Sequence, residues 1–177
     1  MTKRQVVQIG NPIIRRKSKT VKNVSSQKVK RVLRDLTNSM RFHGLVGMAA
    51  PQIGLNLRIF VTEIRKTKTR RKQKKADPLR IYVNPSIVVY SKKHVLGYEG
   101  CGSVASGQLF GSVRRPGEVT IKAQNERGEI FTLQAKGLLA RVIQHELDHL
   151  EGIVFIDRVS DTKKLIGRDE YIQRFRA

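Results

Sequence analysis

The chain has 177 residues, enough for one hydrophobic core and short for two, so we predict a single domain over residues 1–177. Its apolar fraction is 39%, and no stretch approaches the roughly 20 consecutive apolar residues of a membrane-spanning helix, which argues against an integral membrane protein. The 36 Lys and Arg against 14 Asp and Glu give a formal net charge of +22, which favours a polyanionic, RNA-rich partner.

The first predicted elements are an arm, a helix and a strand. Residues 6–9 are a short apolar run before a turn, which predicts an edge strand or an extended arm. Apolar residues recur at helical spacing over residues 26–42, which predicts an amphipathic helix with Ser25 or Ser26 as its N-cap. Residues 57–64 follow as a predicted strand.

The middle of the chain is predicted to be mostly β-structure around a basic insert over about residues 65–77. Residues 65–75 hold eight Lys or Arg among eleven positions and no hydrophobic residue, so we expect a solvated hairpin tip. Asn84 and Pro85 separate two apolar runs, which predicts two antiparallel strands joined by a turn, and a second such pair surrounds the turn at residues 125–129. The runs are residues 81–83 and 87–90 in the first pair and 119–123 and 130–133 in the second.

Two helices are predicted in the C-terminal part. Apolar residues between Gly137 and Leu150 cover most of the girth of a helix, so we expect this helix to be buried in the core. Residues 163–176 mix charged with apolar residues and predict a terminal helix on the surface. The sequence therefore predicts an α+β fold, in which antiparallel or mixed β-sheets pack around a central buried helix, with one further helix toward each end of the chain.

The predicted buried helix carries two histidines at the spacing of metal ligands. His145 and His149 are four residues apart, hence one turn apart on the same face, so both imidazoles can reach one ion. Glu146 follows the first of them, where its carboxylate can act as a general base without binding the ion. The alternative is a pair of core histidines satisfied by local hydrogen bonds. Burying these polar groups without a cation would be costly, which favours the metal site.

A catalytic metal usually has a third protein ligand and one open position. No histidine follows His149, and Glu151, Asp157 and Asp161 lie in an ordinary charged mixture. The other candidate is Cys101, the only cysteine, which lies between glycines in a predicted turn. A lone cysteine excludes an internal disulfide and fits a reducing compartment; it can be a small buried hydrophobic residue, a nucleophile or a metal ligand.

Three motifs, in this order, resemble those of the peptide deformylase family. The chain reads GMAAPQ at residues 47–52, EGCGS at residues 99–103 and HELDH at residues 145–149, and the resemblance covers nearly the whole chain. It implies a peptide deformylase-like fold. It also implies that Cys101, His145 and His149 are the metal ligands, that Glu146 is the acid/base, that the Gln52 amide and the Gly102 backbone N–H stabilise an oxyanion, and that Gly47, Met48, Glu99 and Gly100 bind substrate.

The resemblance implies a hydrolase that removes the N-formyl group from the formyl-methionine of newly made proteins and releases formate. The cofactor is then one divalent ion per chain, with Fe²⁺ favoured and Zn²⁺ or Ni²⁺ possible, since ligand types alone do not select the metal. We expect formylmethionyl peptides and nascent chains as substrates, and the ribosome as a partner of the basic surface through its rRNA. Two alternatives stay open, a deformylase-like metal-binding protein of weak or altered activity that associates with ribosomal RNA, and a metallopeptidase.

The start of the chain lacks the apolar run of a secretory signal, so we expect a cytoplasmic protein. An organellar location or a phage origin stays open.

Three features depart from the family pattern. Leu45 stands where the first motif has its first glycine, and Gly44 comes one place early. Gly102 stands after the cysteine, where a leucine or another larger residue is usual, so we expect a wall of the pocket to be missing there. The segment after the cysteine is slightly longer, and Arg114 and Arg115 come late in it, so the arginine that supports the site in the family stays unassigned in this chain. We therefore expect a divergent deformylase, slower or with an altered substrate preference.

Overall fold

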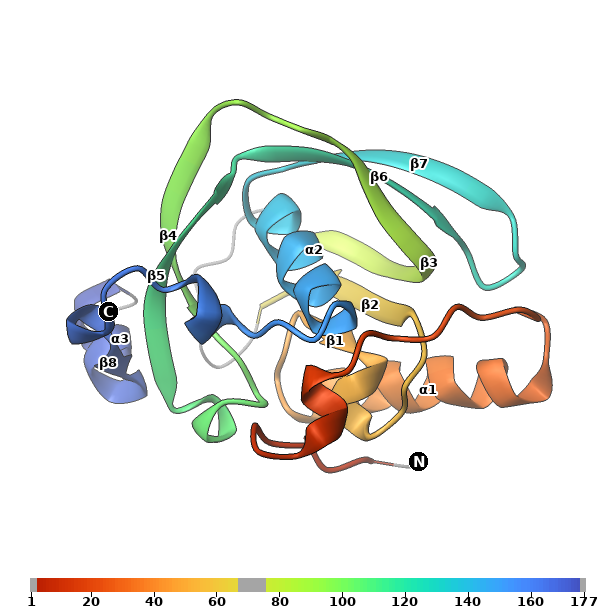
Figure 1. Cartoon of the computed structure of the whole chain (residues 1–177), viewed down its shortest axis with the longest axis horizontal. Helices are drawn as coiled ribbons and strands as arrows, with labels where there is room; N and C mark the ends of the chain where they lie inside the picture. The colour runs from red at the N-terminus through yellow and green to blue at the C-terminus, as the bar shows by residue number, and fades with distance from the viewer. Residues whose placement is uncertain (1–2, 67–75, 176–177) are drawn as a thin grey trace.

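The structure, a computed structural model, describes residues 3–66 and 76–175, which form two antiparallel sheets around a central helix (Figure 1). The larger sheet has the strand order β1-β2-β3-β6-β7, and the smaller one has the order β4-β5-β8. The predicted α+β fold with sheets around one helix is confirmed, and every pairing between the named strands is antiparallel. The helices are α1 (Gln27–Phe42), α2 (Gly137–Leu150) and α3 (Arg168–Phe175), and the strands are β1 (Gly47–Ala49), β2 (Ile59–Ile64), β3 (Asp77–Tyr90), β4 (His94–Gly100), β5 (Leu109–Pro116), β6 (Glu118–Gln124), β7 (Ile130–Lys136) and β8 (Ile166–Gly167).

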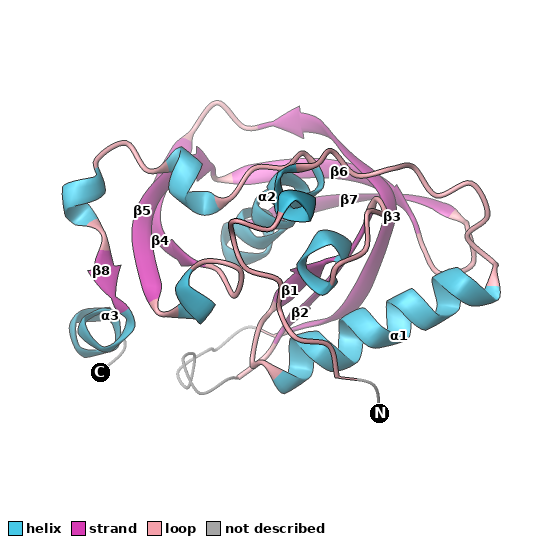
Figure 2. Ribbon diagram, turned by 60° about the horizontal axis from the view of Figure 1, so that its bottom comes forward, coloured by secondary structure: helices cyan, strands magenta, loops and turns pink. Residues whose placement is uncertain are grey.

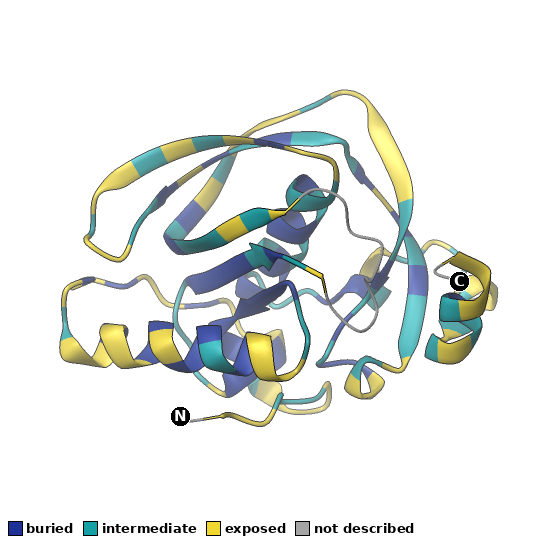
Figure 3. Ribbon diagram, turned by 180° about the vertical axis from the view of Figure 1, so that it is seen from behind, coloured by how far each residue is buried: buried dark blue, intermediate teal, exposed yellow. Residues whose placement is uncertain are grey.

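The N-terminal arm and α1 follow the sequence prediction. The arm is extended and is held by backbone hydrogen bonds from Val7 N to Gln52 O and from Ile9 N to Ser103 O, both 2.8 Å long. Ser26 caps α1, because its Oγ accepts a hydrogen bond from Val29 N at 3.3 Å. The apolar face of α1 packs on β1 and β2 (Figure 2), while its charged face is exposed (Figure 3).

The prediction of a turn at Asn84 and Pro85 is wrong, because β3 runs through these residues as one strand of 14 residues. Asn84 adopts a positive φ of 52°, and the register with β6 shifts between Val83 and Ser86, which are the signs of a β-bulge. The Asn84 side chain fixes the bulge by accepting from Val21 N at 2.8 Å and donating to Val21 O at 2.9 Å. Asparagine tolerates this backbone conformation, so the strand bends here without reversing.

The second predicted strand pair is confirmed as the hairpin of β6 and β7. Its turn is closed by the Asn125 side chain, which accepts hydrogen bonds from Arg127 N and Glu129 N at 2.9 and 3.0 Å. The smaller sheet adds the pair of β4 and β5, in full register from His94 opposite Pro116 to Gly100 opposite Phe110. Cys101, which directly follows β4, is therefore buried inside the molecule.

Helix α2 lies between the two sheets, and no residue after Gly137 in this helix is exposed (Figures 1 and 3). The predicted terminal helix is shorter than expected, because residues 162–164 form a 3-10 turn and β8 precedes α3. Tyr171 of α3 is buried and stacks on Phe110 of β5, with 4.2 Å between the ring centroids. The aromatic contact fastens this helix to the smaller sheet.

The predicted basic hairpin tip falls mostly on residues 67–75, which lie outside the described residues. The strands on either side of it, β2 and β3, pair antiparallel. Within residues 3–66 and 76–175, no helix is both long enough and apolar enough to cross a lipid bilayer.

Candidate active site

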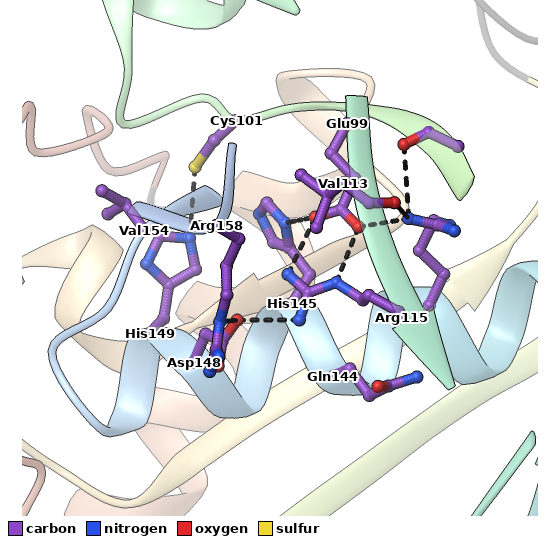
Figure 4. Close-up of polar contacts among 12 residues, drawn as sticks. Glu99, Cys101, Val113, Arg115, Gln144, His145, Asp148, His149, Val154 and Arg158 are labelled. Carbon is purple, nitrogen blue, oxygen red and sulfur yellow. Dashed lines mark hydrogen bonds and ion pairs between the residues drawn. The ribbon is translucent and has the colours of Figure 1, made fainter. Parts of the chain in front are cut away.

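The three side chains predicted as metal ligands lie together where β4 ends beside α2. Cys101 directly follows β4, and His145 and His149 stand one turn apart on α2. One ligand atom from each lies within 4.8 Å of the other two, and Cys101 Sγ lies 3.1 Å from His149 Nε2 (Figure 4). A thiolate and two imidazoles are donors that divalent transition metals accept, and three protein ligands leave one position for water. These residues therefore fit one divalent ion.

Cys101 is buried, yet its surroundings favour the thiolate. Burial alone would raise the pKa of the thiol, but the charge of His149 and hydrogen bonds with His145 and His149 lower it well below the ordinary 9.0. Ser103 N also donates to the sulfur at 3.4 Å. The thiolate is the form that binds metal, so the lowered pKa of Cys101 favours its role as a ligand.

Glu99 holds His145 in place. The Nδ1 atom of His145 lies 3.0 Å from Glu99 Oε2, so as a donor it leaves Nε2 to face an ion (Figure 4). The same carboxylate accepts hydrogen bonds from Arg115 at 2.7 and 2.9 Å and from Arg141 at 2.7 Å. Burial alone would raise the pKa of Glu99, but the hydrogen bonds from His145 and Arg115 hold it well below the ordinary 4.5. Protein partners thus bind both oxygens of Glu99, so this side chain is well placed to orient His145.

Arg115, which the sequence alone did not allow us to assign, supports the site. It is 4% exposed and bridges two carboxylates, donating to Glu99 and, at 2.8 Å, to Asp148 Oδ2. Arg158 donates to the other oxygen of Asp148 at 2.7 Å. A 3-10 turn, Ala105–Gly107, lies between Cys101 and β5, and β5 pairs with β4 in continuous register. Position in the sheet, and not distance along the chain, therefore decides which arginine reaches Glu99.

Glu146 lies beside the histidines with room for its carboxylate. Burial raises the pKa of Glu146 to about 7, although the neighbouring imidazoles oppose this. Its Oε2 atom is buried and has no hydrogen-bond partner among the described residues. Gly47 provides the space, because a Cβ there would collide with this carboxylate and lie 2.7 Å from Val142 Cγ1. The carboxylate is thus placed to exchange a proton with a molecule in the site.

Two hydrogen-bond donors belong to residues that line the cavity beside the Cys101 sulfur, Gln52 and Gly102. Gln52 is 2% exposed, and its Oε1 accepts from Ala49 N at 2.8 Å, which turns its amide nitrogen toward Cys101 Sγ at 3.6 Å. The same nitrogen lies 3.4 Å from Ser103 Oγ. The backbone N–H of Gly102 makes no hydrogen bond to any described residue. Both groups can therefore donate to a ligand next to the sulfur.

A cavity of about 830 Å³ opens beside these residues. Gly47, Glu99 and Gly100, which the sequence predicts to bind substrate, line it, and a Cβ at Gly100 would lie 2.7 Å from the Phe110 ring. Met48, also predicted to bind substrate, is fully buried in the core beneath α1, and its side chain does not line the cavity. Successive residues of a strand point to opposite faces, and Gly47 occupies the cavity face. The remaining walls include Tyr98, Leu138, Arg141 and Val142, and the lining also includes Arg41, Arg65 and Arg168.

Comparison with known proteins identifies relatives along nearly the whole chain. The family model described as polypeptide deformylase matches residues 3–165. A peptide deformylase of Dictyoglomus turgidum is 39% identical over 161 residues, covering 91% of this chain and 95% of that protein. A solved structure of a class I type b peptide deformylase from Acinetobacter baumannii aligns with a TM-score of 0.85 at 29% identity, covering 90% of this chain and all of that one. Its Met-Ala-Ser-bound structure aligns with a TM-score of 0.83 at 29% identity, covering 89% of this chain and all of that one.

Proposed function

The chain belongs to the peptide deformylase family, whose members are metallohydrolases, and we propose that it removes the N-formyl group of newly made proteins at the Cys101, His145 and His149 cluster. The observation that carries this proposal is the convergence of one thiolate and two imidazoles from separate elements beside the buried carboxylate of Glu146. The products are formate and a free N-terminal amine. The comparisons do not favour the alternative of a metal-binding protein with weak or altered activity.

Cys101, His145 and His149 would hold the divalent ion, which lowers the pKa of a water molecule and so supplies the nucleophile near neutral pH. We propose Fe²⁺ as the native ion, with Zn²⁺ or Ni²⁺ as substitutes, since a mixed sulfur and nitrogen donor set accepts all of them. Glu99 fixes the ring of His145, and Arg115 and Arg141 hold Glu99 as a carboxylate.

Glu146 carries the proton in this mechanism. Its carboxylate takes a proton from the attacking water and delivers it to the nitrogen of the leaving amine, as a general base and then a general acid. A pKa of about 7 suits both steps, because the group can accept and release a proton near neutral pH. The free Oε2 atom in a buried site supports this role.

The amide of Gln52 and the backbone N–H of Gly102 would stabilise the negative charge that develops on the formyl oxygen. Both are donors beside the Cys101 sulfur, and Ala49 N fixes the orientation of the Gln52 amide. A fixed donor of this kind contributes about 3 kcal/mol to the stability of a transition state.

The substrate would lie along the cavity with its methionine side chain against apolar walls. Leu138 and Val142 of α2 supply such walls, and Gly47 belongs to β1, the edge strand of the larger sheet. An edge strand can bind an extended peptide through backbone hydrogen bonds. The Met-Ala-Ser-bound structure of the A. baumannii relative supports a short methionyl peptide as ligand.

The net charge of +22 supports a further proposal, that the protein acts in the cytoplasm on nascent chains while its basic surface contacts ribosomal RNA. The exposed face of α1 contributes Lys28, Lys30, Arg31 and Arg34 to this surface.

Replacing Glu146 with glutamine tests the mechanism. The amide cannot accept the proton of water, so we expect kcat to fall at least roughly a hundredfold while metal content stays at the wild-type level. Glu151→Gln is the matched control, because Glu151 caps the same helix but binds Arg58 and Lys17 outside the cavity. If Glu146→Gln with full metal content turns over formyl-Met peptides as fast as the wild type does, another residue carries the proton.

A further inference from the structure

Leu45 and Gly102 are two positions at which this chain departs from the family pattern, and they lie next to each other in the structure. A Cβ built on Gly102 would lie 3.3 Å from Leu45 Cδ1 and 3.4 Å from Val6 Cγ1. The φ angle of Gly102 is outside the left-handed region, so its backbone conformation does not require glycine. Leu45 and Val6 therefore border the space above Gly102, and a larger side chain at position 102 would require them to shift.

Leu45 is held firmly in the loop between α1 and β1. Gly44, with a φ of 67°, turns the chain after α1, and Leu45 N then donates to Met40 O at 2.9 Å. The carbonyl of Leu45 accepts a hydrogen bond from Arg65 Nη2 at 3.0 Å. Both polar groups of the Leu45 backbone are thus engaged, and its half-buried side chain lines the cavity beside Gly102.

Gly102 is fixed from a second direction by the N-terminal arm. Gln8 Nε2 donates to Gly102 O at 2.8 Å, and Val6 of the same arm packs over the Cα atom. A glycine in a loop has backbone freedom that these contacts remove. These contacts hold the Gly102 backbone next to the N–H group that follows Cys101.

We propose that Leu45 and Gly102 form a reciprocal pair, in which Leu45 supplies from the α1–β1 loop the cavity wall that the residue after Cys101 would otherwise supply. The wall is not missing, as the sequence suggested, but comes from another element. Leu45 is accordingly a positioning residue that holds the Gly102 N–H toward the formyl oxygen, an inference that rests on the proposed role of this N–H. It also sets the shape of the cavity next to the sulfur.

The test compares four proteins: the wild type, Leu45→Gly, Gly102→Leu and the double variant. Three quantities are measured: kcat and KM on formyl-Met-Ala-Ser, and the melting temperature of the metal-loaded protein. Gly102→Leu should lose roughly tenfold or more in kcat/KM and melt roughly 2–4 °C lower, because its side chain collides with Leu45. Leu45→Gly should lose kcat more than it raises KM, because the N–H loses its support while the substrate walls on α2 remain.

The double variant decides the proposal. If the two residues are reciprocal, it should recover to within roughly threefold of wild-type kcat/KM and melt above both single variants, a non-additive result expected only of residues in contact. Leu55→Gly combined with Gly102→Leu is the matched control, since Leu55 is half-buried against the same core cluster but does not line the cavity. This combination should show no recovery.

Losses in the double variant that equal the sum of the single losses in both measurements would overturn the proposal. If the wild type has no activity on formyl-Met-Ala-Ser, the proposed function is refuted. The melting temperatures would still decide whether glycine at position 45 with leucine at position 102 packs as well as the wild-type pair.

Discussion

Arg115 is the residue on which most of the polar contacts behind the histidines depend. It joins Glu99, which orients His145, to Asp148, and all three of these charged side chains are buried. Buried carboxylates are stable only when paired, so removing the shared cation leaves part of their charge uncompensated.

We expect Arg115→Met to lower the free energy of unfolding by about 3 kcal/mol, measured by urea denaturation of the metal-free protein. Arg115→Lys should restore only part of this loss, because an ammonium cannot donate in the forked pattern that reaches both carboxylates. Arg114→Met is the control, since Arg114 is exposed and its change should stay within about 0.5 kcal/mol. If Arg115→Met and Arg114→Met are equally stable, Arg141 and Arg158 alone compensate the charges of Glu99 and Asp148.

Among the site residues, those that are close together in the sequence could be predicted from it. Helical spacing alone places His145 and His149 on one face, and their neighbour Glu146 comes with them. Arg115 was missed because its contact with Glu99 depends on the register of β5 with β4, which the sequence does not reveal. A signal did exist, because Asp148 is a charged residue in a helix that was expected to be buried and therefore needed a cation.

At the scale of elements, α1 and β2 are joined by a group of charges centred on Glu63. Arg41 at the end of α1 donates to both oxygens of Glu63 at 2.9 and 2.7 Å, and Arg65 after β2 donates at 3.0 Å. The hydrogen bonds with Arg41 are the main reason why the pKa of Glu63 lies below its ordinary 4.5. Both arginines also line the cavity.

This pKa has a consequence for stability. A carboxylate whose pKa is lower in the folded than in the unfolded chain stabilises the fold above its unfolded pKa and loses this contribution as the pH falls through the folded value. We therefore expect Glu63→Gln to melt below the wild type at pH 7, and the difference to shrink as the pH is lowered below 4.5. Glu126→Gln serves as the control, because Glu126 is exposed and has no ion pair among the described residues. A difference for Glu63→Gln that is constant with pH would contradict this account.

Elements were predictable where one pattern dominated. The apolar girth of α2 and the amphipathic face of α1 each gave the correct helix, because a helix buries the same side along its length. Asn84 and Pro85 carried a turn signal that the structure uses as a bulge, since contacts with Val21 and Gln124, distant in sequence, stabilise the continued strand. Such long-range contacts are what a local pattern cannot contain.

The positive net charge of the whole molecule has no role in the proposed reaction and instead bears on what the protein binds. If α1 contacts ribosomal RNA, replacing Lys30, Arg31 and Arg34 together with glutamine should weaken ribosome binding. The slope of log K against log salt should become shallower by roughly 0.7–0.9 for each phosphate that the variant no longer neutralises. Cosedimentation with ribosomes over a salt series measures this. The control neutralises three exposed cations elsewhere, Lys92, Lys93 and Arg114, and an equal effect of both sets would argue against a specific role of α1.

Deformylation itself is measured as the release of formate from formyl-Met-Ala-Ser by metal-loaded protein purified without oxygen, with unmodified Met-Ala-Ser as the comparison. We expect one formate and one free amine for each formylated peptide consumed, and no change in the unmodified peptide. Intact formyl-Met-Ala-Ser in the presence of fully loaded protein, or cleavage of the bond between methionine and alanine, would contradict it.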